Sequence, residues 1–278
     1  MRRYIELDDI MVDKLIVAPQ IVVYKNIFKN SKELINTLSE DKEDSIFDPW
    51  RQWYQQGYRK DVVFDLNKKY QETEESSYLL EVCNAVNFIR KDYFDDFEKE
   101  KGVWPSFINN WDDLKKSQEI FYLDYFRYIK EQNHYSQENL LMEYHVDEFP
   151  VVNEAKTRRH VLTINFYLNN DYEGGEISAY DSISNKSYTY KPQPGDAVVM
   201  PSTEPFYHAV KGFKGADRYF LRSFIDYRMD SEEEWVSKYR LQYSGMAEEV
   251  QQHEDDYVSK DLQIITVSSA EEVIVRGD

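Results

Sequence analysis

The stretch VLTINFYL at residues 161–168 alternates between two kinds of side chain. Its even-numbered members are all apolar, whereas its odd-numbered members are Val161, Thr163, Asn165 and Tyr167. A period of two is typical of a β-strand whose two faces meet different surroundings. We therefore predict a strand with two unlike faces, one apolar and one mixed, with Asn165 and Tyr167 on the mixed face.

Turn-forming residues follow this stretch at short intervals. NND at 169–171, GG at 174–175 and PQPGD at 192–196 favour tight connections between strands. Five of the nine glycines and four of the eight prolines lie between residues 174 and 215. These features predict a sheet of short antiparallel strands that extends from about residue 122 to residue 227.

The residues before this zone combine helices with short strands. IVVY at 21–24 predicts a strand, and Asn30 or Ser31 is a suitable cap for a short helix after it. Between residues 77 and 100, apolar side chains recur at steps of three and four, which predicts a longer helix packed on a sheet. The segment 112–129 is compatible with either a helix or a strand.

Composition limits the class of protein. The chain has 278 residues, of which 41% are hydrophobic, so it can bury a large core and is not globally disordered. Its formal charge of −18 repels phosphate backbones, so we expect no nucleic acid as partner. No stretch approaches the ~20 consecutive apolar residues of a membrane span, and no targeting segment is visible. We therefore expect a cytoplasmic protein that does not bind membranes.

Two further features concern Cys83 and the C-terminal zone. Cys83 is the single cysteine, which excludes an internal disulfide and a thiolate metal cluster; we interpret it as a buried residue of a helix. Residues 228–278 hold 13 acidic and 5 basic side chains, which favours a solvated helix followed by a loosely docked tail. Apolar runs at 264–267 and 273–275 are the alternative there, because they could add late strands.

The five histidines differ in their neighbours. His145 and His253 each have an aspartate two positions later, whereas His134 and His160 have no acidic residue at that spacing. On an extended segment, an H-x-D triplet places imidazole and carboxylate on one face, where both can bind one ion. His253 lies in the acidic tail with no later histidine, so we do not assign it to a metal site.

His145 and Asp147 have a third partner in His208, which we expect on the same sheet, at the end of a strand that begins near Ala197. Two histidines and one carboxylate leave coordination positions open, which suits a non-haem Fe(II) centre, whereas a closed zinc site needs a fourth ligand. Arg218 follows ten residues after His208, and we expect it on a neighbouring strand beyond the metal. A guanidinium there can bind the distal carboxylate of a dicarboxylic acid that chelates the iron.

In order and spacing, seven short motifs of this region resemble the iron(II)- and 2-oxoglutarate-dependent dioxygenases of the prolyl hydroxylase type. The motifs are HVD at 145–147, TINFYLN at 163–169, GGE at 174–176, PGDA at 194–197, PS at 201–202, HAV at 208–210 and RY at 218–219. The resemblance implies an α+β fold with a double-stranded β-helix (jelly-roll, cupin-like) core and N-terminal supporting helices. It divides the chain into supporting helices and strands at 1–115, the oxygenase core at 116–228, and an acidic C-terminal helix and tail at 229–278.

The resemblance also implies the site. His145, Asp147 and His208 would bind Fe(2+), while Arg218 and Tyr167 would hold the far carboxylate of 2-oxoglutarate. With O2 as co-substrate and ascorbate as an optional reductant, the enzyme would hydroxylate an unactivated C–H and release succinate and CO2. Two departures from the family pattern concern the substrate: a longer, polar segment at residues 129–136, and a second arginine at 222.

Several alternatives stay open at this point. The resemblance favours a prolyl residue in a peptide or protein as substrate, while a free amino acid or other small metabolite is the main rival. Arg222 could contact the substrate, assist Arg218 or pair with an acidic neighbour, and Asn165 has the same ambiguity. A nucleic-acid demethylase would carry a second arginine in a pattern that residues 218–224 do not reproduce. A catalytically silent scaffold would not need all three ligands and the arginine.

Overall fold

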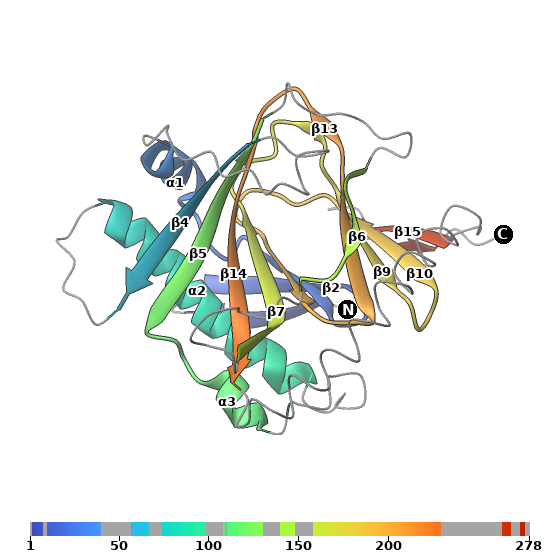
Figure 1. The fold of residues 1–278 in the computed structure, drawn as a ribbon, viewed down its shortest axis with the longest axis horizontal. Helices are drawn as coiled ribbons and strands as arrows, with labels where there is room; N and C mark the ends of the chain where they lie inside the picture. Colours follow the sequence, from blue (N-terminus) through green and yellow to red (C-terminus); the bar gives the residue numbers. More distant parts are fainter. Residues whose placement is uncertain are drawn as a thin grey trace.

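The computed structural model describes residues 2–7, 10–39, 57–66, 74–97, 108, 110–129, 140–147, 158–228, 263–267 and 273–275. Two β-sheets face each other, and helices cover the outer side of the larger one (Figure 1). No helix among these residues is long and apolar enough to cross a membrane. The predicted α+β architecture with a core of antiparallel sheets is confirmed.

The larger sheet has eight strands, all paired antiparallel. In spatial order they are β1 (Arg2–Leu7), β2 (Ile10–Ala18), β3 (Ile21–Lys25), β11 (Ala197–Pro201), β7 (Arg158–Tyr167), β14 (Arg218–Arg228), β5 (Ile120–Tyr128) and β4 (Gly57–Asp65). Strands from the first 65 residues therefore continue the sheet that carries VLTINFYL. The strand predicted at 21–24 is β3, which pairs with β11 at the centre of this sheet.

The smaller sheet has six strands and faces β7 and β14. In spatial order they are β16 (Val273–Val275), β15 (Gln263–Val267), β10 (Lys186–Tyr190), β9 (Ile177–Asp181), β12 (Phe206–Lys211) and β6 (Leu140–His145). In the C-terminal zone, residues 263–267 and 273–275 thus form strands, as the alternative prediction has it. β15 pairs in parallel with β10 and antiparallel with β16. The helix expected in that zone falls mainly on residues outside the described ones. A two-stranded ribbon, β8 (Glu173–Gly174) with β13 (Phe213–Lys214), completes the fold.

Three helices are described: α1 (Ser31–Leu38), α2 (Glu74–Phe97) and α3 (Trp111–Lys115). α2 is the long helix predicted from residue 77, and it begins three residues earlier. Its buried stripe packs with the even-numbered face of β7 in one apolar cluster, and Cys83 is part of that stripe. The ambiguous segment 112–129 contains both structures, since α3 ends at Lys115 and β5 begins at Ile120.

A buried charge joins α2 to the sheet. The Lys14 side chain of β2 is 1% exposed, and its ammonium forms ion pairs with Asp92 and with Asp96, the latter at 2.7 Å. The Tyr24 hydroxyl of β3 donates a hydrogen bond of 2.6 Å to Asp92 Oδ2. Removing one partner of such a group leaves the others desolvated and unpaired, which is costly. This group therefore fixes the position of α2 on the outer face of the sheet.

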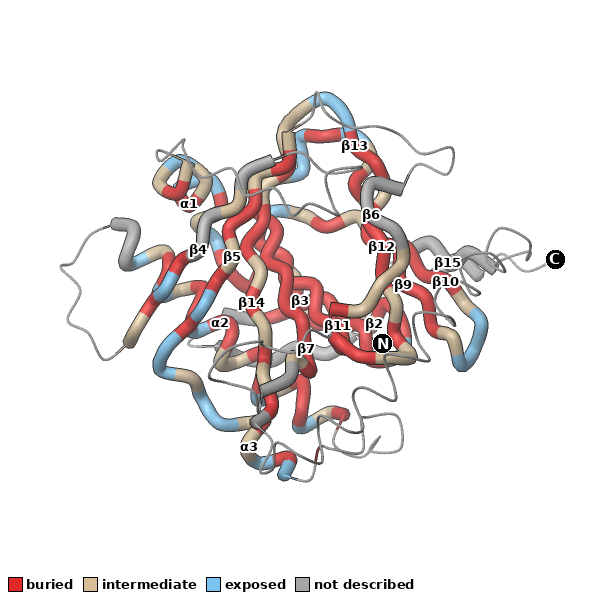
Figure 2. The backbone as a smooth tube through the Cα atoms, in the orientation of Figure 1, coloured by how far each residue is buried: buried red, intermediate tan, exposed pale blue. Residues whose placement is uncertain are grey.

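A second apolar cluster lies between the sheets and holds Tyr167, Phe220 and Phe126, with the rings of Phe126 and Phe220 stacked at 4.7 Å. Figure 2 shows the central strands of the larger sheet buried along most of their length. The mixed face of VLTINFYL thus points between the sheets, except for Val161, which packs in the helix-side cluster. Opposite Val161, the pairing of β7 with β14 shifts register between Ile225 and Asp226. Such an irregularity changes the direction in which a side chain points, which explains the position of Val161.

One strand prediction is wrong. Ala197 and His208 do not share a strand, because β11 ends at Pro201 in the larger sheet and β12 begins at Phe206 in the smaller one. The turn before β11 is tightly constrained at Gly195, which has a φ of +88°. A Cβ at this position would lie 2.6 Å from the backbone oxygen of Phe28, so only glycine fits.

Candidate active site

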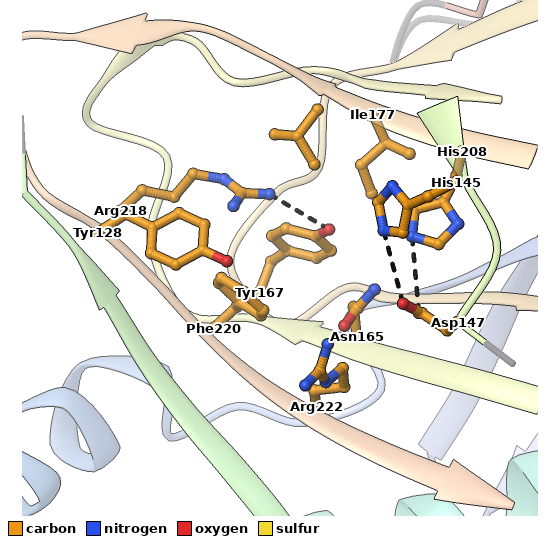
Figure 3. A pocket seen from close by; sticks show the side chains of 11 residues that line it. Tyr128, His145, Asp147, Asn165, Tyr167, Ile177, His208, Arg218, Phe220 and Arg222 are labelled. Atoms are coloured by element: carbon orange, nitrogen blue, oxygen red, sulfur yellow. Dashed lines mark hydrogen bonds and ion pairs between the residues drawn. The ribbon is translucent and has the colours of Figure 1, made fainter. Parts of the chain in front are cut away.

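His145, Asp147 and His208 converge at one end of the smaller sheet (Figure 3). His145 ends β6 and is the cross-strand partner of His208 in β12, so the two rings lie 4.2 Å apart between centroids. Asp147 follows two residues after β6. Its Oδ1 lies 3.5 Å from His145 Nε2, and its Oδ2 lies 3.6 Å from His208 Nε2. One ligand atom from each residue falls within 4.8 Å of the others.

The larger sheet supports Asp147. Thr163 of β7 donates a hydrogen bond of 2.9 Å from Oγ1 to Asp147 Oδ2, and Ser202 lies 2.8 Å from the same hydroxyl. All three side chains are buried. A bond that orients a carboxylate in this way also tunes its affinity for a metal. The period of two placed Thr163 on the mixed face, but its contact with Asp147 depends on how the two sheets face each other.

Asp147 is ionised. Burial alone would raise its pKa, but His208 and His145 hold the pKa of this carboxyl well below its usual range. Among the described residues, Asp147 Oδ1 has no hydrogen-bond partner. Neighbouring ligand atoms around an ion at about 2.1 Å stand roughly 3 to 4 Å apart. Two imidazoles and one carboxylate at this spacing fit a 2-His-1-carboxylate Fe(II) centre with open positions.

Arg218 begins β14 and lies in the same pocket. Its side chain is 1% exposed, and its Nη2 donates a long hydrogen bond of 3.4 Å to the Tyr167 hydroxyl. Aromatic rings line the guanidinium, with Cζ 4.9 Å from the ring centroid of Phe220 and 5.7 Å from that of Tyr128. Arg218 Nε and Nη1 have no hydrogen-bond partner among the described residues. A buried fork with two unused donors is suited to a bidentate carboxylate.

Tyr167 is held as a hydrogen-bond donor. Burial raises the pKa of its phenol far above the ordinary value, against the opposing charge of Arg218. Its hydroxyl therefore stays protonated and points toward the guanidinium (Figure 3).

The strand that carries Arg218 does not lie beside the strand of His208. The sequence predicts a strand neighbouring that of His208 for Arg218, whereas β14 pairs with β5 and β7 in the opposite sheet. After β12 the chain crosses through β13 and returns in the larger sheet. The guanidinium therefore faces the metal ligands across the space between the sheets.

Arg222 and Asn165 line the same pocket. They are direct cross-strand partners on β14 and β7, and Arg222 is also paired across the sheet with Asp124 of β5. Arg222 Nε and Nη2 donate to Asp124 Oδ2 at 3.1 and 2.9 Å. Of the three roles considered for Arg222, pairing with an acidic neighbour is therefore present, and Asp124 is the partner that sequence reasoning missed.

The pocket includes about 390 Å³ of empty space, open solvent at its mouth included. Its remaining walls are Ile177 and Val210. His160 lies elsewhere, with Nδ1 2.5 Å from Asp226 Oδ1 and its ring stacked on Phe224. His134, His253 and most of the segment 129–136 fall outside the described residues.

Comparison with known proteins gives one family match. Residues 131–226, about a third of the chain, match the model described as the 2OG-Fe(II) oxygenase superfamily. This segment contains all three candidate metal ligands, Arg218 and Tyr167. Residues 131–226 are thus similar to the 2OG-Fe(II) oxygenase superfamily, and the predicted enzyme class, with Fe(2+) and 2-oxoglutarate, is the class that this family model describes. No curated protein matches the sequence.

Solved structures of similar fold include a prolyl-4-hydroxylase from Pseudomonas putida, with 13% identity and a TM-score of 0.48, covering 75% of this chain and 92% of that one. A viral collagen prolyl hydroxylase from Paramecium bursaria Chlorella virus-1 has 12% identity and a TM-score of 0.41, covering 74% and 96%. A 2OG-Fe(II) oxygenase family oxidoreductase from Burkholderia pseudomallei has 14% identity and a TM-score of 0.43, covering 77% and 88%. At these values the similarities carry no assignment of substrate.

Proposed function

We propose that this chain is an Fe(II)- and 2-oxoglutarate-dependent dioxygenase that hydroxylates a prolyl residue in a peptide or protein. The main observation in support of this reaction is that three metal-binding side chains and a guanidinium group face each other across one pocket. On one side stand His145, Asp147 and His208, and on the other stands Arg218 with two unused donors. This arrangement suits a co-substrate that has a metal-binding end and a distal carboxylate.

Each residue of the pocket has its own role in the proposed reaction. His145, Asp147 and His208 would hold Fe(II), and Thr163 fixes the orientation of Asp147 through its hydroxyl. Arg218 and Tyr167 would bind the distal carboxylate, and the apolar walls exclude water around it. Bound Fe(II) supplies the redox chemistry by which O2 converts 2-oxoglutarate to succinate and CO2 and one oxygen atom enters a substrate C–H bond. Ascorbate as reductant stays a prediction.

A peptide substrate is supported by exposed side chains on the sheet face that continues from the pocket along β5. Tyr128 lines the pocket from β5, and Tyr122, six positions earlier, lies on the same face of that strand because side chains alternate with a period of two. Tyr122 is 65% exposed, and its cross-strand partner Val63 is 57% exposed. Exposed apolar and aromatic side chains on a sheet face that leads to a site favour docking of an extended chain such as a proline-rich peptide.

The test combines binding and turnover. Fe(II) and 2-oxoglutarate are added without O2, and the weak visible band of the chelate is recorded; then O2 is admitted and succinate is measured with and without a proline-rich peptide. We expect the band and stimulation of succinate formation by the peptide. The double variant Tyr122→Ser with Val63→Ser should keep the band and reduce the stimulation. A band without stimulation by peptide would move the substrate to a small molecule, and no band would contradict the oxygenase itself.

A free amino acid or other small metabolite is the second candidate. Arg222 favours it, because a guanidinium that lines the pocket is suited to the carboxylate of such a molecule.

A further inference from the structure

A row of three polar side chains crosses the larger sheet beside the metal ligands. Asp124, Arg222 and Asn165 are direct cross-strand partners on β5, β14 and β7, so they share one face. The next row toward Arg218 consists of Phe126, Phe220 and Tyr167, which are paired in the same manner. An aromatic row therefore separates two arginines that face one pocket (Figure 3).

The separation means that the two arginines serve different groups. Four residues of strand place the backbones of Arg218 and Arg222 about 13 Å apart. Each guanidinium packs on aromatic rings of its own surroundings, with the Arg222 Cζ 4.9 Å from the Phe126 centroid and 4.7 Å from the Phe224 centroid. Arg222 is therefore not a second clamp for the carboxylate that Arg218 would bind.

Arg222 shares its acidic partner Asp124 with a second arginine, Arg59. Both of its hydrogen bonds go to Asp124 Oδ2, while Arg59 Nη2 donates to Asp124 Oδ1 at 2.9 Å. One carboxylate thus divides its charge between two guanidinium groups. Burial lowers the pKa of the Arg222 guanidinium, but Asp147 and Asp124 raise it above the ordinary value, so the group keeps its charge. Neither of the two bonds to Asp124 uses Nη1, so this fixed cation keeps a donor for an anion in the pocket that it lines.

Asn165 gives independent evidence for a ligand. Its side chain is 8% exposed and lines the pocket, and its Oδ1 has no hydrogen-bond partner among the described residues. A buried polar atom without a partner is costly unless a ligand or water satisfies it. The amide therefore offers an acceptor next to the cation of Arg222.

We propose that Arg222 and Asn165 form a subsite for the primary substrate, in which Arg222 binds a carboxylate and Asn165 accepts a hydrogen bond from an N–H next to it. The inference rests on the proposed function, since 2-oxoglutarate occupies the Arg218 end. The carboxylate has two sources: an acidic side chain beside the proline of a peptide, or the α-carboxylate of a free amino acid.

The test measures binding of paired probes to the full chain loaded with Mn(II) and 2-oxoglutarate in the absence of O2. The peptide pair is a blocked tetrapeptide with aspartate beside proline and the same peptide with asparagine; the amino acid pair is proline and prolinamide. Titration calorimetry on the wild type should show about 10- to 100-fold tighter binding of the acid in one pair, and that pair identifies the source.

The variant D124N/R222Q removes the charges of the pair together and keeps two side chains that can hydrogen-bond to each other. It should lose the preference for the acid and retain its affinity for 2-oxoglutarate. The matched control D217N/R127Q removes an arginine–aspartate pair outside the pocket, joined at 2.8 Å, and should keep the preference.

Equal affinity for acid and amide in a wild-type protein that binds 2-oxoglutarate would overturn the subsite alone, as would a preference that survives in D124N/R222Q. Failure of the wild type to bind 2-oxoglutarate would overturn the proposed function instead.

Discussion

Arg218 and Arg222 project from the same face of β14 into one pocket, with the ring of Phe220 between their positions on the strand. Arg218 keeps two donors without partners among the described residues, whereas Arg222 is held by Asp124. The two guanidinium groups therefore present different surfaces to a ligand. One is an open fork for an incoming carboxylate, and the other is a fixed cation beside the metal ligands.

The metal centre is tested by His208→Ala, which removes one of three ligands. We expect binding of Fe(II) or Mn(II) to fall at least about 100-fold, because two ligands remain and the metal loses its fixed geometry. His160→Ala is the matched control, since His160 pairs with Asp226 away from the site and its loss should leave metal affinity unchanged. Equilibrium dialysis against Mn(II) measures both variants, and wild-type affinity in His208→Ala would contradict the assignment.

Arg218→Gln tests the carboxylate clamp. Truncating one partner of a buried charge pair costs roughly 2–5 kcal/mol, so the concentration of 2-oxoglutarate needed for half-saturation should rise about 30-fold or more. Tyr167→Phe removes one neutral hydrogen bond and should have a smaller effect, about 5-fold. The measurement is titration with 2-oxoglutarate in the presence of Mn(II). An equal effect of the two substitutions would show that the charge of Arg218 is not what binds the ligand.

Thr163→Val removes the hydroxyl that orients Asp147 and keeps the shape of the side chain. Loss of such a hydrogen bond to a metal ligand weakens metal binding by about 10- to 100-fold, and we expect this in Mn(II) binding. Thr163→Ser keeps the hydroxyl and should restore affinity. If Thr163→Ser were as weak as Thr163→Val, packing rather than the hydrogen bond would explain the loss.

Cys83 provides a probe of folding at high pH. Burial raises the pKa of its thiol to about 12, so the folded protein keeps the thiol protonated up to that pH. In the unfolded chain the thiol ionises near pH 8.5. The contribution of Cys83 to stability is therefore complete below about pH 8.5 and decreases as pH rises toward 12. Native protein at pH 8 should not react with a thiol reagent, whereas unfolded protein should react at once; rapid reaction without unfolding would contradict the buried position.

Local patterns were sufficient for much of the fold. The period of two in VLTINFYL predicted β7 and the shared face of Thr163, Asn165 and Tyr167, because a pleated strand alternates its side chains whatever it packs against. The stripe in residues 77–97 predicted α2 for a similar reason. Local patterns do not predict which of the two sheets a strand joins. They predict His208 on the strand of Ala197 and Arg218 on a strand neighbouring that of His208, whereas the structure divides each of these two pairs between the two sheets.

The chemical groups of the site can be recognised without a structure: two histidines, a carboxylate and a later arginine stand at spacings that resemble one family of oxygenases. Which of these groups meet depends on the folded chain. The fold brings Thr163 to Asp147 and joins Asp124, Arg222 and Asn165 in one row, although the residues in these contacts are 16 to 98 positions apart in the chain. Such contacts depend on the register of the strands and on how the two sheets face each other. Many residues jointly determine the register and the packing of the sheets, so no short motif predicts the contacts.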